Sequence, residues 1–357
     1  MREGNPVSGR GVSTRGIERA LRCSCLGSIP ALLLAACSVV TIAPGEPSKP
    51  AEPLPDDVAH RFDYTEQGAP LTSWTCVSTH EGDAYDIYKV DGSVTLKGDN
   101  HPTPVEVEYW RTKKTQRAPA VVITPILGGG NEIARLIARE FAEAGMHGVI
   151  VWRGVKVLAP NWSEEEVDYA LRRGIVARRR VIDWLDARPE VDPRRIAAFG
   201  ISMGGICTAV LAPVEPRVHS AVLALTGGDL ASVVMKSDEG RVVSYKNARL
   251  TEERLTPGEL EKKLREQLVD DPINLARYAD SSRFLMFIAR HDTTVPTRNQ
   301  VELRRALGNP KAFDMPTSHY STIAFTPFVR AQSTTWLLER MKEPNPRVAE
   351  VDTAKAH

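Results

Sequence analysis

Residues 195–205 read Arg-Ile-Ala-Ala-Phe-Gly-Ile-Ser-Met-Gly-Gly, a short apolar strand followed by a tight turn and the start of a helix. Gly200 and Gly204 flank Ser202 at the spacing G-x-S-x-G. Small residues two positions before and two positions after the serine permit a strained strand-to-helix turn that pushes the hydroxyl into the open. Because a pattern with three fixed positions also arises by chance, the rest of the chain has to supply partners for Ser202.

The composition suits one large globular domain with additions. Of 357 residues, 42% are hydrophobic and 25% are charged, and the formal net charge is +1. The chain is long enough to bury a sizeable core. Its near-neutral charge gives no electrostatic case for binding nucleic acid.

The first 36 residues have the pattern of a secretion signal. Five arginines precede an apolar run from Leu26 to Ala36, which is too short to span a bilayer. The run ends in Leu34-Ala35-Ala36-Cys37, which resembles the bacterial lipoprotein box. The resemblance implies cleavage before Cys37, a lipid on its thiol and a membrane-anchored protein of the cell envelope. An ordinary signal peptide or an uncleaved anchor is the alternative.

Residues 37–62 are expected to form the lipidated N-terminus and a stiff, solvated tether. Five prolines between Pro44 and Pro55 stand among charged and small polar residues, a composition typical of extended linkers. The folded domain is then expected over residues 63–342, with a flexible tail at 343–357. Removal of the signal leaves lipidated Cys37 and two unmodified cysteines, Cys76 and Cys207. Cys207 is expected to pack as a small apolar residue rather than form a disulfide.

The order of apolar runs predicts an α/β fold with a mostly parallel sheet and helices on both faces. Two half-buried strands are expected near residues 85–90 and 105–110. Continuous apolar runs typical of strands covered on both faces follow at 121–123, 149–152, 196–199, 222–225 and 284–288, with a shorter strand at 312–315. Helical patterns separate them, and a final helix is expected from about Tyr320 to Met341. In such sheets the ligand binds at the carboxyl ends of the strands.

The alternation of strands and helices lapses between about residues 228 and 280, where a mostly helical insert is predicted. Thr256-Pro257-Gly258-Glu259 forms a capping box with proline at the first helical position. Leu260, Leu264 and Leu268 then lie on one apolar face. We interpret the insert as a cap over the site, with mere decoration of the fold as the alternative.

A base for Ser202 can be chosen by chain order. A serine hydroxyl is a poor nucleophile unless a histidine, oriented by a carboxylate, takes its proton, and in this type of fold the order is Ser, acid, His. Among the eight histidines, that order leaves His291 and His319 once the terminal residue, His357, is set aside. His319 is the better base, because it follows the strand at 312–315 and comes 27 residues after Asp292, enough for one helix and one strand.

Asp292 is the preferred acid, since it lies just beyond the buried strand at 284–288. Asp229, one strand earlier, is the alternative. Asp292 would fix the tautomer of His319 and stabilise the imidazolium that forms when Ser202 loses its proton.

The oxyanion of a tetrahedral intermediate also needs donors. One is expected to be the backbone N–H of Met203, at the start of the helix behind the serine. The second is expected to be the amide of Gly129, in the loop after the first buried strand, with Leu127 and Gly128 shaping the turn.

Together these motifs resemble the α/β-hydrolase superfamily over roughly residues 85–342. The resemblance is closest to its dienelactone-hydrolase and acetyl-esterase-like branches, through Val191-Asp192-Pro193-Arg194-Arg195-Ile196 ahead of the nucleophile strand. One departure is Leu127, where many relatives have a histidine. The resemblance implies a serine hydrolase that cleaves small-molecule carboxylic esters through an acyl-enzyme on Ser202, without a cofactor or a metal.

Two other functions stay open, a peptidase or thioesterase with the same triad and a catalytically silent lipoprotein that binds a partner. Arg153, after the strand at 149–152, is a candidate for binding a substrate carboxylate. A run of arginines on the helix before Ser202 is expected to be a solvated or ion-paired surface: Arg172, Arg173, Arg178, Arg179 and Arg180. The sequence holds neither a P-loop nor an H-E-x-x-H zinc motif.

Overall fold

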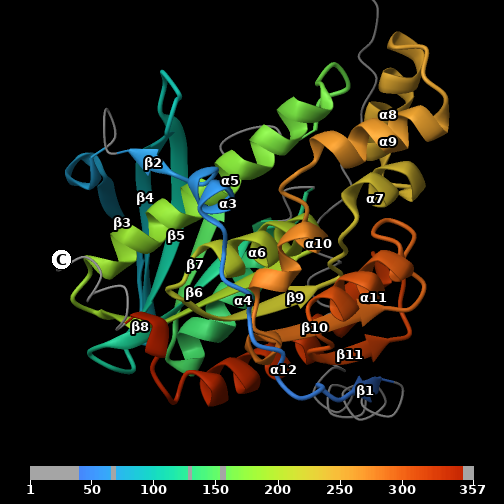
Figure 1. The fold of residues 1–357 in the computed structure, drawn as a ribbon. Helices are drawn as coiled ribbons and strands as arrows, with labels where there is room; N and C mark the ends of the chain where they lie inside the picture. The colour runs from blue at the N-terminus through green and yellow to red at the C-terminus, as the bar shows by residue number, and fades with distance from the viewer. Residues whose placement is uncertain (1–39, 66–69, 128–130, 153–157, 349–357) are drawn as a thin grey trace, which may run out of the picture. The chain divides into compact units, whose positions relative to one another are not determined.

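The computed structural model describes residues 40–65, 70–127, 131–152 and 158–348. In these residues the chain forms an eleven-stranded sheet with the order β1-β11-β10-β9-β8-β6-β7-β5-β4-β2, and β3 also pairs with β4 (Figure 1). The strands are β1 (Thr41–Ala43), β2 (Tyr64–Thr65), β3 (Thr75–Glu81), β4 (Tyr85–Leu96), β5 (Thr103–Thr112), β6 (Ala118–Thr124), β7 (His147–Trp152), β8 (Val191–Ile201), β9 (Val218–Ala224), β10 (Phe284–Ala289) and β11 (Lys311–Met315).

The centre of the sheet is parallel, as the sequence predicted. Strands β7, β6, β8, β9, β10 and β11 pair in parallel, whereas β5, β4, β3 and β2 extend it as antiparallel strands. Every residue of β9 and β10 is buried, because helices cover both faces. The carboxyl ends of the parallel strands therefore meet at one edge of the sheet.

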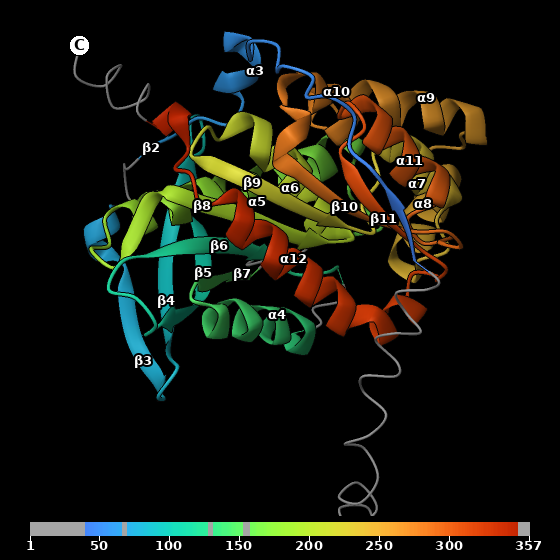
Figure 2. The ribbon, with the colours of Figure 1, turned by 90° about the horizontal axis from the view of Figure 1, so that it is seen from below.

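Two sets of helices cover the faces of the sheet. The helices are α3 (Asp56–His60), α4 (Asn131–Ala144), α5 (Glu164–Asp186), α6 (Met203–Val214), α7 (Leu230–Lys236), α8 (Gly240–Glu252), α9 (Pro257–Gln267), α10 (Pro272–Leu275), α11 (Thr297–Ala306) and α12 (Thr326–Arg340). Helices α4 and α12 lie on one face (Figure 2), where Phe141 and Leu337 pack in one cluster with Phe199 of β8. Helices α5 and α6 cover the other face, where Ile175 and Val210 pack against Ile196. None of the described helices is long and apolar enough to cross a lipid bilayer.

The expected helical insert lies between β9 and β10 and comprises α7, α8, α9 and α10. Thr256 and Glu259 form the predicted capping box at the start of α9, and Leu260 and Leu264 are fully buried. These leucines pack in a small cluster with Tyr245 of α8. The insert thus has a hydrophobic core of its own.

Arginines of α5 form ion pairs, in line with the expected ion-paired surface. Arg178 and Arg180 are buried, which corrects the expectation that they lie on the surface. Arg178 is almost wholly buried, and its guanidinium donates hydrogen bonds to Thr124 Oγ1, the Gly174 carbonyl and the Val151 carbonyl. Arg172 pairs with Asp168 and Asp270. The guanidinium of Arg178 therefore ties α5 to the ends of β6 and β7.

The described part of the expected tether packs on the domain instead of standing free. Strand β1 pairs antiparallel with β11 and extends the sheet. Beyond it, the Glu46 amide donates to the Asn309 carbonyl at 3.0 Å and the Glu52 amide to the Arg277 carbonyl at 3.0 Å. The prolines of this segment are compatible with its packing, since proline favours an extended backbone and has no N–H group that would need an acceptor. Cys37 lies outside the described residues.

The predicted flexible tail at 343–357 is also corrected in its described part. Asn345 is buried, and its side-chain amide donates to the carbonyls of Pro216 and Arg217. Val348 is buried too, so the domain extends at least to this residue. Cys76 is exposed and Cys207 is buried on α6, and no disulfide joins these two residues.

Phe62 provides a test of the N-terminal correction. Its ring is fully buried in the core cluster under β4 and α5, so Phe62→Ala is expected to lower the free energy of unfolding by about 3–5 kcal/mol. Urea denaturation followed by circular dichroism measures this change. Val77→Ala on β3 is the control, because Val77 is 60% exposed. Equal stabilities of the two variants would contradict the packed position of Phe62.

Candidate active site

Ser202 occupies a strained turn between β8 and α6. Its backbone angles are φ 56° and ψ −122°, a conformation that is rare for a residue with a side chain. The turn is held on both sides, because the Ser202 amide donates to the Ala224 carbonyl at 2.8 Å and the Ser202 carbonyl accepts from the Ile206 amide at 3.0 Å. The strained position places the serine at the wall of a cavity of about 270 Å³.

The glycines around Ser202 are required by close backbone approaches. A Cβ on Gly200 would lie 2.2 Å from the Gly204 carbonyl oxygen, and a Cβ on Gly204 would lie 2.1 Å from the Thr124 carbonyl oxygen. A Cβ on Gly205 would lie 1.7 Å from Thr226 Oγ1. Helix α6 can therefore begin directly behind Ser202 only where these positions have no side chain.

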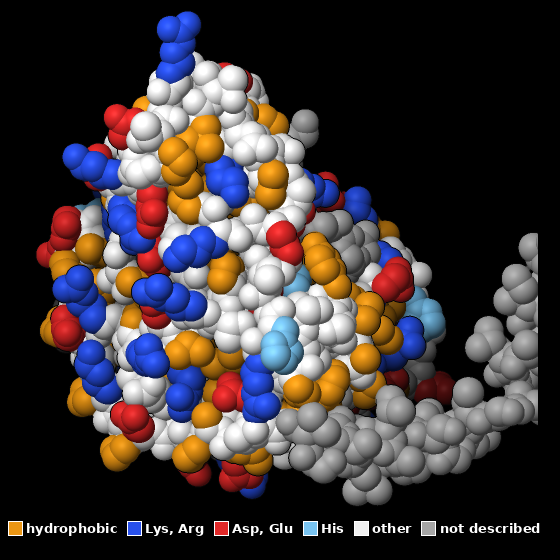
Figure 3. Space-filling view, turned by 90° about the vertical axis from the view of Figure 1, so that its right-hand side faces the viewer, with side chains coloured by type: hydrophobic (Ala, Val, Ile, Leu, Met, Phe, Trp, Pro, Cys, Tyr) orange, Lys and Arg blue, Asp and Glu red, His pale blue; other side chains and the backbone are white. Residues whose placement is uncertain are grey.

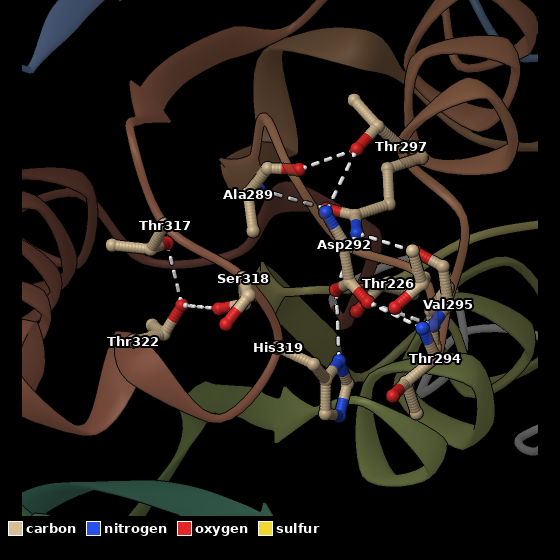
Figure 4. Close-up of polar contacts among 12 residues, drawn as sticks. Thr226, Ala289, Asp292, Thr294, Val295, Thr297, Thr317, Ser318, His319 and Thr322 are labelled. Carbon is tan, nitrogen blue, oxygen red and sulfur yellow. Dashed lines mark hydrogen bonds and ion pairs between the residues drawn. The ribbon is translucent and has the colours of Figure 1, made fainter. Parts of the chain in front are cut away.

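His319 and Asp292 form a hydrogen-bonded pair at the same edge of the sheet. His319 Nδ1 lies 2.8 Å from Asp292 Oδ2, as Figure 4 shows. The side chain of Asp292 is fully buried and that of His319 is 11% exposed. Asp292 follows β10 and His319 follows β11, so neighbouring parallel strands bring them together. His319 and Ser202 line the same cavity.

Both carboxylate oxygens of Asp292 are engaged. Oδ1 accepts hydrogen bonds from the amides of Thr294 and Val295, each at 2.9 Å. Oδ2 accepts from Gln300 Nε2 at 2.8 Å, in addition to its contact with His319. Gln300 is fully buried on α11. The sequence analysis did not identify it as a partner of Asp292, because its only signal in the sequence is its position one helical turn into α11. These contacts fix the orientation of the carboxylate, and through it that of the imidazole.

His319 lies in a loop and not at the start of the last helix. A 3₁₀ turn, η5 (Ser321–Phe325), comes first, and α12 begins only at Thr326, with Pro327 in its first turn. Proline suits the first turn of a helix, where the missing N–H costs nothing. Hydrogen bonds among the hydroxyl side chains on either side of His319 hold the loop: Thr317 with Thr322, as Figure 4 shows, and Ser318 with Ser321.

Asp229, the alternative acid, is engaged elsewhere. Its side chain accepts from the Ser232 amide at the start of α7 and pairs with Arg265 of α9 at 2.5 Å. Its backbone amide donates to Asp271. These contacts connect parts of the insert, and the carboxylate beside His319 is that of Asp292.

The other predicted site residues fall into two groups. Met203 is the first residue of α6 and lines the cavity together with Leu127. The backbone N–H of a first helical residue has no acceptor within the helix, so that of Met203 is available to a ligand. Gly128, Gly129 and Arg153 lie outside the described residues. In the described ranges no group of three His, Cys, Asp or Glu side chains could hold a metal ion.

Comparisons with known proteins agree with this architecture. The dienelactone hydrolase family matches residues 108–242 and the prolyl oligopeptidase family matches residues 178–320. No curated protein matches the chain. An acetyl xylan esterase from Paenibacillus sp. R4 is 19% identical, with a TM-score of 0.55 over 78% of this chain and 99% of that one. Acetyl xylan esterase 1 from Thermoanaerobacterium sp. JW/SL YS485 is 18% identical, with a TM-score of 0.54 over 78% and 94%.

The chain has the α/β-hydrolase fold. The sheet order, the strained serine turn and the structural neighbours agree on this point. Its sequence is similar to two families of hydrolases, and both matches include Ser202.

The contact behind Ser202 leads to a prediction about stability. Gly205→Ala forces a methyl group against Thr226 and is expected to lower the free energy of unfolding by about 1–3 kcal/mol. Gly258→Ala in α9 is the matched control, because no atom lies within 4 Å of the added Cβ and alanine favours a helix over glycine. Chemical denaturation measures both variants. A Gly205→Ala protein as stable as Gly258→Ala would show that α6 can move away from Thr226 without cost.

Proposed function

We propose that the protein is a serine hydrolase that cleaves carboxylic esters through an acyl-enzyme on Ser202. The observation that carries the proposal is the placement of strained Ser202 and the His319–Asp292 pair on one cavity. The names of the structural neighbours, two of which are acetyl xylan esterases, support an ester as the substrate. The reaction requires no cofactor.

In the proposed first step, Ser202 Oγ attacks the carbonyl carbon of the ester and its proton passes to His319 Nε2. The C–O bond to the alcohol then breaks, and His319 returns the proton to the departing oxygen. Water attacks the acyl-enzyme in the second step, again with His319 as the base, and releases the acid and Ser202. Asp292 remains ionised and stabilises the imidazolium in both steps.

The negative oxygen of the tetrahedral intermediate needs backbone donors. We propose the Met203 amide as one of them, since the N-terminus of α6 also favours negative charge. The second donor is proposed to be the Gly129 amide, in the loop that continues from Leu127.

Labelling of Ser202 tests the function. A fluorophosphonate probe reacts with activated serines, so it is expected to label the wild-type protein and not Ser202→Ala. The same substitution is expected to lower kcat for p-nitrophenyl butyrate by at least about 10³-fold, because the nucleophile is lost. A wild-type protein that resists the probe would contradict the proposal.

Substitution of each of the two candidate aspartates tests which of them orients His319, and the Asp229 variant is the matched control. Asp292→Asn is expected to slow both labelling and turnover, whereas Asp229→Asn keeps them near wild type because Asp229 contacts the insert. The reverse order would assign the acid to Asp229.

Cleavage of peptide anilides in preference to esters would favour the peptidase, in line with the prolyl oligopeptidase match.

We also propose that this activity is located in the cell envelope on a lipid anchor. The support comes from the sequence of residues 1–37, namely the arginine-rich leader, the short apolar run and the Leu-Ala-Ala-Cys motif.

Cys37→Ser tests the anchor. In cells fed an alkyne analogue of palmitate, the wild-type protein is expected to carry the label and to sediment with membranes, because a lipid with two acyl chains on the thiol binds a bilayer stably. The variant is expected to lose both properties. Cys76→Ser, which removes an exposed cysteine, is the control and should keep them. Equal labelling of the two variants would contradict the anchor.

A further inference from the structure

The cavity beside Ser202 is far more apolar than the hydrolysis of an ester requires. Isoleucine, leucine, valine and methionine form most of its described wall. Its volume of about 270 Å³ has space on the order of ten water molecules. An acetyl group fills only a small part of that space.

The apolar wall extends on both sides of the strand ends that carry Ser202. On one side, Ile133 and Ile137 of α4 and Val329 of α12 line the cavity, and Figure 2 shows that these helices share one face of the sheet. On the other side, Leu171 of α5 and Val234 of α7 line it. A carbonyl carbon held at Ser202 therefore has apolar surface available to each of its two substituents.

The polar side chains of the described wall, apart from Ser202, His319 and the exposed Tyr320, bond within the protein. Ser237 Oγ donates to the Thr294 carbonyl at 2.7 Å. Glu239 accepts from the amides of Arg241 and Val242 at the start of α8. The three threonine hydroxyls of the wall donate to neighbouring oxygens: Thr294 to Asp238, Thr322 to Ser318 and Thr326 to Ile323. The wall thus presents a substrate mainly with hydrocarbon.

The charge near the cavity disfavours an anionic substrate. No arginine or lysine is found in the described wall, whereas Glu239 is part of it. Hydrogen bonds from Thr293 and Thr294 lower the pKa of Asp238, so this neighbouring carboxylate remains ionised at neutral pH. Among the described lining residues, a carboxylate on the substrate would meet the like charge of Glu239 and no cation.

The apolar surface continues to the outside at the rim. Tyr320 and Ile323 both line the cavity, and they are 69% and 64% exposed. Figure 3 shows hydrophobic side chains in patches among charged ones on the side of the molecule that bears α8, α9 and α11. Large exposed hydrophobic side chains that adjoin an apolar cavity are typical of a binding site for an apolar molecule.

We infer that the substrate is an uncharged ester that is apolar on both sides of its carbonyl, with a medium-length acyl chain. This inference rests on the proposed ester hydrolysis at Ser202. It separates this chain from its neighbours named as acetyl xylan esterases, because an acetylated polysaccharide has a very short acyl group and a polar alcohol.

Two series of esters test the inference on the intact chain. In the first, p-nitrophenyl esters from acetate to octanoate vary the acyl group; in the second, butyrate esters from methyl to hexyl vary the alcohol. Full burial of a methylene is worth about fourfold in kcat/KM. We expect kcat/KM to rise at least about tenfold from acetate to hexanoate, and to rise with the length of the alcohol in the second series as well. A maximum at acetate, or no gain with the longer alcohol, would overturn the inference.

A charged probe tests the second part of the inference. The p-nitrophenyl monoester of succinic acid resembles the pentanoate in size but carries a carboxylate. We expect its kcat/KM to be at least about tenfold lower than that of the pentanoate. Equal or faster cleavage of the succinate would show that the site accepts an anion.

Variants on the two sides of the cavity locate the chains. Val234→Phe and Val329→Phe narrow the insert side and the α12 side, and each is expected to shift one of the two series toward shorter esters. Val77→Phe, outside the cavity and 60% exposed, is the control. Unchanged chain-length profiles in both cavity variants would contradict the use of these walls.

Fluorophosphonate labelling of each variant separates the possible failures. A protein that is labelled at Ser202 but prefers acetate or succinate retains the proposed hydrolase function and loses only the substrate class. A wild-type protein that is not labelled loses the proposed function itself.

Discussion

The close approach of α6 to the sheet behind Ser202 is the constraint on which the site depends. Gly200, Gly204 and Gly205 bring backbone against backbone and against Thr226, at distances where no side chain fits. Ser202 is thereby held at φ 56°, an unfavourable conformation that the surrounding packing has to offset. Helix α6 supplies that packing, because nearly all of its residues are buried. A rigid, buried helix thus holds a serine at the carboxyl edge of the sheet.

At the carboxyl edge of the sheet, His319 lies between a polar environment around Asp292 and an apolar cavity. Asp292 is enclosed by donors from its own loop and from Gln300, so the polar groups behind His319 are satisfied and immobile. In front of His319 the described cavity wall is mostly hydrocarbon, and polar members such as Ser237 and Thr294 bond to the protein. Reactive polarity is therefore concentrated at Ser202 and His319. This division suits chemistry at one carbonyl inside an otherwise apolar ligand, since an apolar site strengthens the electrostatic interactions at the reacting atoms.

The boundaries of the domain show where composition misleads. A proline-rich segment has the same composition whether it is free in solvent or lies extended along a surface, because proline favours extended backbone in both cases. The difference comes from distant partners, such as the Asn309 carbonyl for Glu46 and strand β11 for β1. The burial of Arg178 was missed for a similar reason. Arg178 is buried because Thr124 and the Val151 carbonyl accept its hydrogen bonds, and neither is near it in the chain.

Chain order and periodicity were sufficient to predict the parallel sheet, the serine turn and the helical insert, and they made Asp292 and His319 candidates, because each of these follows from local pattern or from the strand that precedes a residue. The contact between Asp292 and His319, the engagement of Asp229 by Arg265 and the role of Gln300 required the fold. So did the walls of the cavity, which come from helices on both faces of the sheet and from the insert. Local sequence sets the direction of a strand or a helix, whereas the neighbours of a side chain depend on how distant segments pack.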